Sequence, residues 1–78
     1  MIKSVKVYST PTCPWCLRLK QFLRENNIHF EDYDVSTDQA RAEEMISISG
    51  QMGVPVLDIE GEIIVGFDKE KIKQALGL

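Results

Sequence analysis

Two cysteines, Cys13 and Cys16, are separated by two residues in the stretch STPTCPWCLRLKQFL, which covers residues 9–23. They are the only cysteines among the 78 residues of the chain. A pair at this spacing can act as a redox couple, supply half of a metal site or form a small covalent staple. Residue type alone leaves all three chemistries open, so the surroundings of the pair must decide between them.

Composition and charge indicate the cellular compartment of the protein and exclude some classes of partner. The formal net charge is −3, and acidic and basic residues are interleaved, so the chain lacks the basic stripe of a nucleic-acid-binding protein. Apolar runs such as 63–65 are too short to span a bilayer, and residues 1–9 alternate in polarity, unlike a signal peptide. We therefore expect a cytoplasmic protein with no membrane or nucleic-acid partner. In that reducing compartment a close cysteine pair is more often catalytic or metal-binding than structural.

The covalent staple is the weakest of the three interpretations. In the chain-entropy model, closing a loop of about four residues stabilises a protein by only about 2 kcal/mol, against about 4.7 kcal/mol for a loop of about a hundred residues. A disulfide between Cys13 and Cys16 would therefore add little stability, and the reducing cytosol would oppose it.

A metal-binding module is the rival class of function. A structural zinc site needs four ligands, and this chain offers two cysteines and the distant His29. One chain alone cannot close such a site. Two chains could share an ion or an iron–sulfur cluster through Cys13 and Cys16, so a dimeric metal-binding module stays as the alternative.

The rest of the chain alternates between strand-like and helix-like segments. In order, the predicted segments are a strand over 2–9, a helix over 14–26, a strand over 29–35, a helix over 36–50, two strands within 54–67 and a helix over 69–76. Glu60 and Gly61 predict the hairpin turn between the last two strands. The first two strands should pair in parallel across their helix. The sequence therefore predicts one α/β domain over residues 1–78, with a four-stranded mixed sheet and helices on both faces.

Helix ends and faces can also be predicted. Ser36 and Gln39 form a capping-box pattern, Gly50 is a C-cap, and Asp68 and Gly77 bound the last helix. Apolar spacing turns a set of side chains inward, namely Ala42, Met45, Ile46 and Ser49 in the second helix and Ile72, Ala75 and Leu76 in the third. Arg18 and Lys20 are expected on the solvated side of the first helix; the alternative is that they add positive potential near the cysteine pair.

The two cysteines occupy different positions at the start of that first helix. Cys13 directly precedes the helix, and Pro14 suits its first position. Unpaired N–H groups and the positive end of the helix dipole would stabilise a Cys13 thiolate, which is the nucleophilic form. Cys16 is in line with Leu19 and Leu23 and so faces the core. This asymmetry suits an attacking thiol and a resolving thiol.

The redox interpretation predicts a two-step exchange. The Cys13 thiolate attacks a disulfide on a partner protein and forms a mixed disulfide, and Cys16 then attacks Cys13 and releases the reduced partner. The reaction leaves the protein oxidised, with Cys13 and Cys16 in a disulfide, so a reductant must regenerate the two thiols. The pair is itself the redox group, so no bound cofactor is expected.

The residues YSTPTCPWC, the Val54-Pro55 step and Gly66-Phe67-Asp68 together resemble the glutaredoxin family of the thioredoxin superfamily. The resemblance is greatest to small bacterial glutaredoxin-like proteins and ribonucleotide-reductase-associated redoxins. It implies a minimal thioredoxin fold and thiol–disulfide oxidoreductase activity. It makes Cys13 the nucleophile and Cys16 the resolving thiol, with Pro14 and Trp15 between them in the active-site loop.

The resemblance also assigns a substrate-binding set. Pro55 would be a cis proline beside the cysteines, and the backbone of Val54 would pair with the substrate as a short added strand. Gly66 and Asp68 would form the rim at the last helix. Phe67 would line the substrate groove or plug the core.

Three departures from the family pattern concern the electron donor. Thr10 and Gly53 replace a lysine and a threonine that glutathione-binding members usually carry, and Val65 stands where a second glycine is common. These changes weaken the case for glutathione and favour a flavoprotein of the thioredoxin-reductase type. A glutathione-dependent glutaredoxin is the alternative. The implied substrates are disulfide-bearing proteins such as ribonucleotide reductase or a peroxiredoxin, and the chain is expected to act as a monomer.

Overall fold

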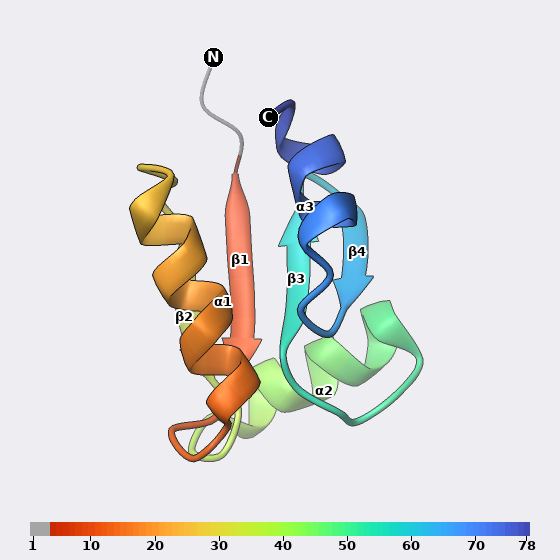
Figure 1. The fold of residues 1–78 in the computed structure, drawn as a ribbon. Coiled ribbons are helices and arrows are strands. Elements are labelled where there is room, and N and C mark those ends of the chain that lie inside the picture. The colour runs from red at the N-terminus through yellow and green to blue at the C-terminus, as the bar shows by residue number, and fades with distance from the viewer. Residues whose placement is uncertain (1–3) are drawn as a thin grey trace.

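The computed structural model of the protein describes residues 4–78. Its elements in chain order are β1 (Val5–Ser9), α1 (Pro14–Glu25), β2 (Glu31–Asp34), α2 (Gln39–Ser49), β3 (Val56–Ile59), β4 (Glu62–Val65) and α3 (Lys69–Leu76) (Figure 1). This is the predicted order β-α-β-α-β-β-α. None of the helices within residues 4–78 is long and apolar enough to cross a membrane.

The four strands form one mixed sheet in the order β2-β1-β3-β4. β1 pairs in parallel with β2, as Val7 opposite Asp32 illustrates, whereas β3 is antiparallel to both β1 and β4. The hairpin between β3 and β4 turns at Glu60 and Gly61, which have positive φ values of 51° and 94°. These pairings confirm the predicted α/β fold with a mixed sheet.

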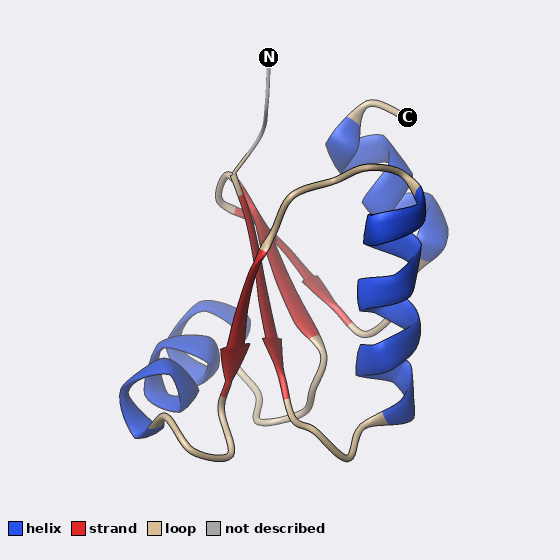
Figure 2. Ribbon diagram, turned by 90° about the vertical axis from the view of Figure 1, so that its left-hand side faces the viewer, coloured by secondary structure: helices blue, strands red, loops and turns tan. Residues whose placement is uncertain are grey.

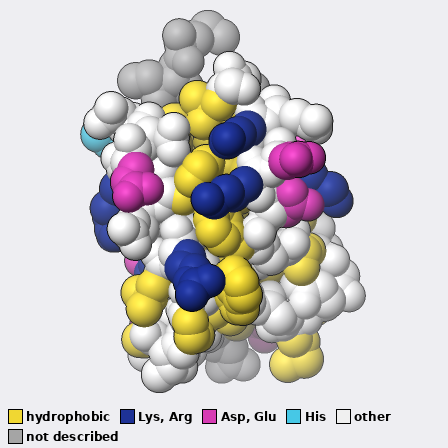
Figure 3. Space-filling view, viewed as in Figure 1, with side chains coloured by type: hydrophobic (Ala, Val, Ile, Leu, Met, Phe, Trp, Pro, Cys, Tyr) yellow, Lys and Arg dark blue, Asp and Glu magenta, His cyan; other side chains and the backbone are white. Residues whose placement is uncertain are grey.

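Helices α1 and α3 cover one face of the sheet, and α2 covers the other (Figure 2). Alternate residues of a strand point to opposite faces, so β1 sends Val5 and Val7 toward α1 and α3 and sends Tyr8 toward α2. The larger apolar cluster lies under α1 and α3, and its buried members are Val5, Val7, Leu19, Leu23, Leu57, Ile59, Ile64, Ile72 and Ala75. Figure 3 looks onto this face and shows an apolar strip still visible between the two helices.

Most of the predicted helix ends are confirmed. Pro14 is at the first turn of α1. Gly50 and Gly77 end α2 and α3 in the left-handed conformation that glycine adopts without steric cost, with φ of 72° and 75°. The carboxylate of Asp68 caps α3 by accepting the N–H of Lys71 at 3.2 Å.

The structure corrects two predictions about α2. Its N-cap is Asp38, whose carboxylate accepts the N–H of Arg41 at 3.1 Å, so the capping box at Ser36 is wrong. Ser36 instead donates its hydroxyl to Asp34 at 2.5 Å and belongs to the turn after β2. Ile46 is exposed, and Ile48 packs beside Met45 in its place. Because α2 begins two residues later than the capping box requires, the capping pattern indicated the wrong start of the helix.

The strands are shorter than predicted. β1 begins at Val5, which pairs with Ile59 of β3. β2 covers only Glu31–Asp34, the residues that pair with positions 6–9 of β1. Of the predicted first strand, residues 2 and 3 lie outside the described part of the chain. His29 precedes β2 and is exposed, as expected for a surface residue.

Candidate active site

Cys13 is the N-cap of α1. Its backbone is extended, with φ −94° and ψ 110°, and its Sγ accepts the backbone N–H of Cys16 at 3.2 Å. Pro14 occupies the first position of the helix, between the two cysteines, and has no backbone N–H of its own to be satisfied. The side chain of Cys13 is half-buried, and its thiol also approaches the carbonyl oxygen of Val54 at 4.0 Å. The sulfur therefore lies at a helix N-terminus with a donor aimed at it and one side open.

Cys16 has the opposite environment. Its side chain is fully buried under α1, next to Leu19 and Leu23 on the same helix face. Burial, together with the hydrogen bond to Cys13, raises the pKa of the Cys16 thiol to about 12. The Thr10 backbone and the Lys20 ammonium act in the other direction and lower that pKa. At neutral pH Cys16 is therefore a protonated thiol held behind the exposed one, and neither cysteine is in a disulfide.

Two loops distant in sequence come together beside the cysteines. The Val54–Pro55 peptide bond is cis, as the family resemblance implies. The N–H of Gly66 donates to the carbonyl of Pro55 at 2.8 Å and ties the loop before β3 to the loop after β4. A groove of about 260 Å³ opens here and is lined by Trp15, Val54, Pro55, Gly66 and Phe67. Four of the five residues that the sequence predicts to bind substrate thus line one groove together with Trp15, and after that prediction we call it the substrate groove.

Val54 presents polar backbone to this groove. Its carbonyl faces the thiol of Cys13, and across residues 4–78 its N–H has no hydrogen-bond acceptor. The side chain of Trp15 is 56% exposed at the other wall. An extended peptide could therefore hydrogen-bond to Val54 while its side chains contact Trp15, in the manner of a strand added to a sheet edge.

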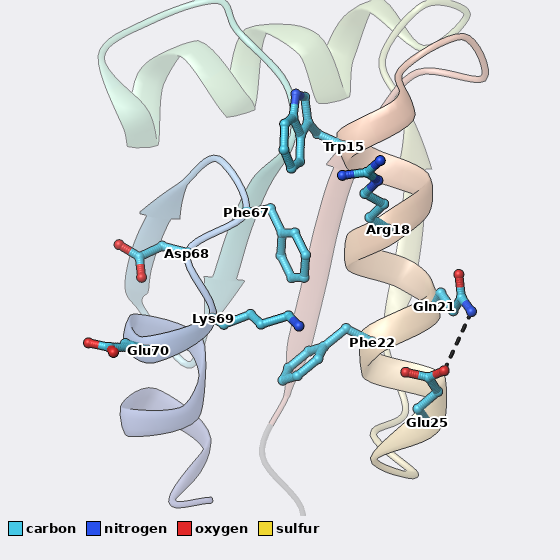
Figure 4. Close-up of a pocket in the computed structure, with 9 residues that line it drawn as sticks. All are labelled: Trp15, Arg18, Gln21, Phe22, Glu25, Phe67, Asp68, Lys69 and Glu70. Atoms are coloured by element: carbon cyan, nitrogen blue, oxygen red, sulfur yellow. Dashed lines mark hydrogen bonds between the residues drawn. The ribbon is translucent and has the colours of Figure 1, made fainter.

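Phe67 and Asp68 have separate positions at the start of α3. Phe67 is half-buried: it lines this groove and also packs against the core, with its ring edge-to-face on Phe22 at a centroid distance of 5.8 Å. Asp68 is not part of the substrate groove. Its carboxylate caps α3 and points away from Trp15 and Phe67 (Figure 4).

Lys20 is a residue whose position the sequence prediction missed. It is buried, not solvated, and its ammonium donates to Asp32 at 2.9 Å and to Ser9 at 3.2 Å. The Ser9 hydroxyl also donates to Asp32 at 2.8 Å, which closes the network. Lys20 follows Cys16 by one helical turn, on the face of Leu19 and Leu23. A lysine at that spacing on the apolar face of a helix was the signal that could have indicated a buried cation.

Metal ligands are few near the cysteine pair. Within residues 4–78, no group of three or more His, Cys, Asp or Glu side chains is arranged to hold a metal ion. A metal bound at Cys13 and Cys16 would therefore need ligands from a second chain or a small molecule.

Comparison with known proteins places the chain among related sequences and structures. A family model described as Glutaredoxin matches residues 5–64, which include both cysteines and Pro55. A glutaredoxin-like 8.6 kDa protein in the rubredoxin operon of Clostridium pasteurianum is 51% identical over 72 residues, or 92% of this chain and 96% of that protein. Glutaredoxin 3 of Escherichia coli (strain K12) is 35% identical over 65 residues, or 83% and 78%. The crystal structure of the thioredoxin-like protein BC3987 matches with a TM-score of 0.88 at 36% identity, covering 94% of this chain and 100% of that one.

Proposed function

Because this chain belongs to the glutaredoxin family of thiol–disulfide oxidoreductases, we propose that it reduces protein disulfides by dithiol exchange through Cys13 and Cys16. The observation that carries the proposal is the asymmetry of the two thiols. Cys13 caps α1 at the surface with a backbone N–H directed at its sulfur, and Cys16 is buried directly behind it. Such a pair can attack with one sulfur and resolve with the other.

In the first step the Cys13 thiolate attacks one sulfur of the substrate disulfide. The substrate S–S bond breaks, a mixed disulfide forms at Cys13, and the second substrate sulfur leaves as a thiolate that takes up a proton. The N–H of Cys16, 3.2 Å from the Cys13 sulfur, stabilises the anion before attack. The substrate strand is held by the backbone of Val54 and by contact with Trp15.

In the second step Cys16 loses its proton and attacks the sulfur of Cys13. The Cys13–Cys16 disulfide forms and the remaining substrate thiolate is released, so the substrate gains two electrons and the protein loses two. The pKa of Cys16 is raised to about 12 mainly by burial, so deprotonation of this thiol should limit the second step at neutral pH. The positive charge of Lys20 opposes the shift and assists this step.

We propose a flavoprotein of the thioredoxin-reductase type as the electron donor. Thr10 offers no cation for a glutathione carboxylate, and one oxygen of Asp68 is already engaged in capping α3. Glutathione remains the alternative donor. Ribonucleotide reductase and peroxiredoxin are the substrate classes that the resemblance suggests.

A coupled NADPH-oxidation assay on the oxidised protein tests both the activity and the donor. One arm supplies a bacterial thioredoxin reductase, and the other supplies glutathione with glutathione reductase. We expect turnover in the first arm. Turnover only with glutathione would overturn the donor, and a coloured, dimeric, metal-laden protein without turnover in either arm would favour the metal-binding module.

Two cysteine variants test the roles of the thiols. Cys13→Ser should lose all disulfide reduction, because no nucleophile remains at the surface. Cys16→Ser should accumulate the mixed disulfide with its substrate, detectable by mass spectrometry, because the resolving thiol is gone. Residual dithiol turnover in Cys13→Ser would show that the nucleophile is assigned wrongly.

A further inference from the structure

A second and larger groove separates α1 from α3 and opens directly beside the substrate groove. It has a volume of about 720 Å³, within the range of pockets that hold drug-sized ligands. Phe22 and Phe67 supply aromatic walls, and Arg18 and Lys69 extend into it from opposite helices (Figure 4). Because Trp15 and Phe67 line both grooves, a chain bound at Cys13 can continue from one into the other. We call this second groove the interhelix groove.

The cations of the interhelix groove are held on aromatic rings. The Lys69 ammonium is 5.7 Å from the ring centroid of Phe22 and 5.8 Å from that of Phe67. The guanidinium of Arg18 is 4.9 Å from the ring of Trp15. Within residues 4–78 neither cation forms an ion pair with a carboxylate. Cation–π contact holds such groups in place and leaves their N–H donors available.

The carboxylates near the groove are arranged differently. Asp68, Glu70 and Glu25 also line the groove. The carboxylates of Asp68 and Glu70 point away from its interior, and Glu25 is at its far end, where it accepts the amide of Gln21 at 3.4 Å (Figure 4). Lys and Arg side chains lie in a row over the apolar strip between the helices, with acidic side chains to either side (Figure 3). In a protein of net charge −3, the charged side chains that extend into this groove between the aromatic rings are therefore the cations Arg18 and Lys69.

We propose that the interhelix groove binds the segment of the substrate protein that flanks the attacked cysteine, and that it selects segments carrying carboxylate side chains next to apolar ones. The carboxylates would pair with Lys69 and Arg18, and the apolar side chains would cover Phe22 and Phe67. Donors already positioned by the rings lose less conformational entropy on binding than free side chains do. The inference rests on the proposed function, because the segment is delivered by the disulfide that Cys13 attacks.

Single-turnover kinetics with two matched peptides test the proposal. Each peptide has one cysteine in a mixed disulfide with thionitrobenzoate, whose coloured release reports the attack by Cys13. The acidic peptide carries alternating glutamate and phenylalanine on both sides of the cysteine, and the neutral peptide replaces every glutamate by glutamine. The protein is reduced beforehand and freed of reductant, so the assay is independent of the electron donor.

We expect the acidic peptide to react roughly fivefold faster than the neutral one at low peptide concentration, as partly exposed charge pairs allow. Lys69→Gln and Arg18→Gln should each slow the acidic peptide roughly two- to fivefold and leave the neutral peptide unchanged. The preference should largely vanish in about 0.5 M NaCl, because salt screens exposed charges. Saturating peptide should restore the rate of the variants, since binding and not chemistry is weakened.

Matched control variants distinguish an effect of the interhelix groove from an effect of the protein's net charge. Lys71→Gln removes one charge from an exposed position of α3 outside the groove, and Arg24→Gln does the same on α1. Both should react like the unmodified protein with either peptide. Equal rates for the two peptides, or the same loss in Lys71→Gln as in Lys69→Gln, would overturn the interhelix groove while leaving the proposed function intact. Failure of both peptides to react would overturn the proposed function and this inference with it.

Discussion

Among residues 4–78, the cluster between the sheet and helices α1 and α3 has nine buried apolar residues, whereas the cluster between the sheet and α2 has three. The first face includes Leu19 and Leu23, which anchor the helix that carries both cysteines. The second is built on Tyr8, Met45 and Val56. The two faces therefore differ in how much apolar burial stabilises them.

Polar contacts replace part of the apolar packing under α2. The Tyr8 hydroxyl donates to Glu44, which also forms an ion pair with Arg41 at 2.8 Å. The Arg41 guanidinium lies 4.0 Å from the ring centroid of Tyr33. Hydrogen bonds and exposed ion pairs each contribute little net stability compared with a fully buried leucine. The face covered by α1, the helix that carries both cysteines, is thus the one with more buried apolar residues.

Truncating one buried side chain on each face tests this difference, and it is the largest effect expected. Leu19→Ala should lower the free energy of unfolding by about 3 kcal/mol, because it leaves a cavity in the larger cluster. Met45→Ala should lower it by about 2 kcal/mol, because fewer apolar neighbours surround it. Urea denaturation followed by the fluorescence of Trp15 measures both.

Leu17→Ala is the matched control for this comparison. Leu17 is on the same helix as Leu19 but is 56% exposed, so its truncation should change stability by less than about 0.5 kcal/mol. A larger loss from Met45→Ala than from Leu19→Ala would reverse the ranking of the two faces.

The buried cation on the α1 side gives the next prediction. Lys20→Met should lower the free energy of unfolding by about 1–2 kcal/mol, because it leaves Asp32 without its ion pair while that half-exposed carboxylate stays hydrated. It should also raise the pKa of Cys16 further, since the Lys20 charge lowers it. The mixed disulfide should then persist longer at neutral pH and resolve at its usual rate only at higher pH. Stopped-flow measurement of resolution against pH checks this.

Lys20→Arg is the control, because it keeps the positive charge at this position. It should restore the pH profile of the resolving step even if packing is disturbed. If the pH profile of the resolving step is unchanged in Lys20→Met, then Lys20 contributes to stability and not to resolution.

The smallest effect is expected on the α2 face. Tyr8→Phe should lower the free energy of unfolding by about 1 kcal/mol at pH 7, because it removes the hydrogen bond to Glu44. Burial and that carboxylate raise the pKa of Tyr8 above its usual value of 10. Above about pH 10 the unfolded chain ionises this tyrosine while the folded protein does not, so unmodified protein loses stability there. Tyr8→Phe has no phenol hydroxyl to ionise at this position, so it does not lose stability in this way.

The gap in stability between Tyr8→Phe and the unmodified protein should therefore narrow as the pH rises above about 10. Urea denaturation at several pH values measures it. A gap that stays constant with pH would show that the Tyr8 phenol is not held protonated by the fold.

Local patterns in the sequence determined much of this protein. The element order, the Asp68 cap, the glycine helix ends and the burial of Cys16 follow from periodicity and capping, which act over a few residues. The asymmetry of the two thiols is likewise local, because three positions along one helix place one sulfur at its end and the other on its inner face. The capping box at Ser36 failed because the competing carboxylate of Asp38 caps the same helix two residues later.

Tertiary structure alone decided the rest. The strand order β2-β1-β3-β4 brings Asp32 to Lys20 and brings the loops at Pro55 and Gly66 to the cysteines, and no local pattern encodes which strands are neighbours. The interhelix groove also exists only because α1 and α3 pack on the same face, which places Arg18 and Lys69 opposite each other. Local sequence thus set the positions of the two sulfurs on α1, and long-range packing set what surrounds them.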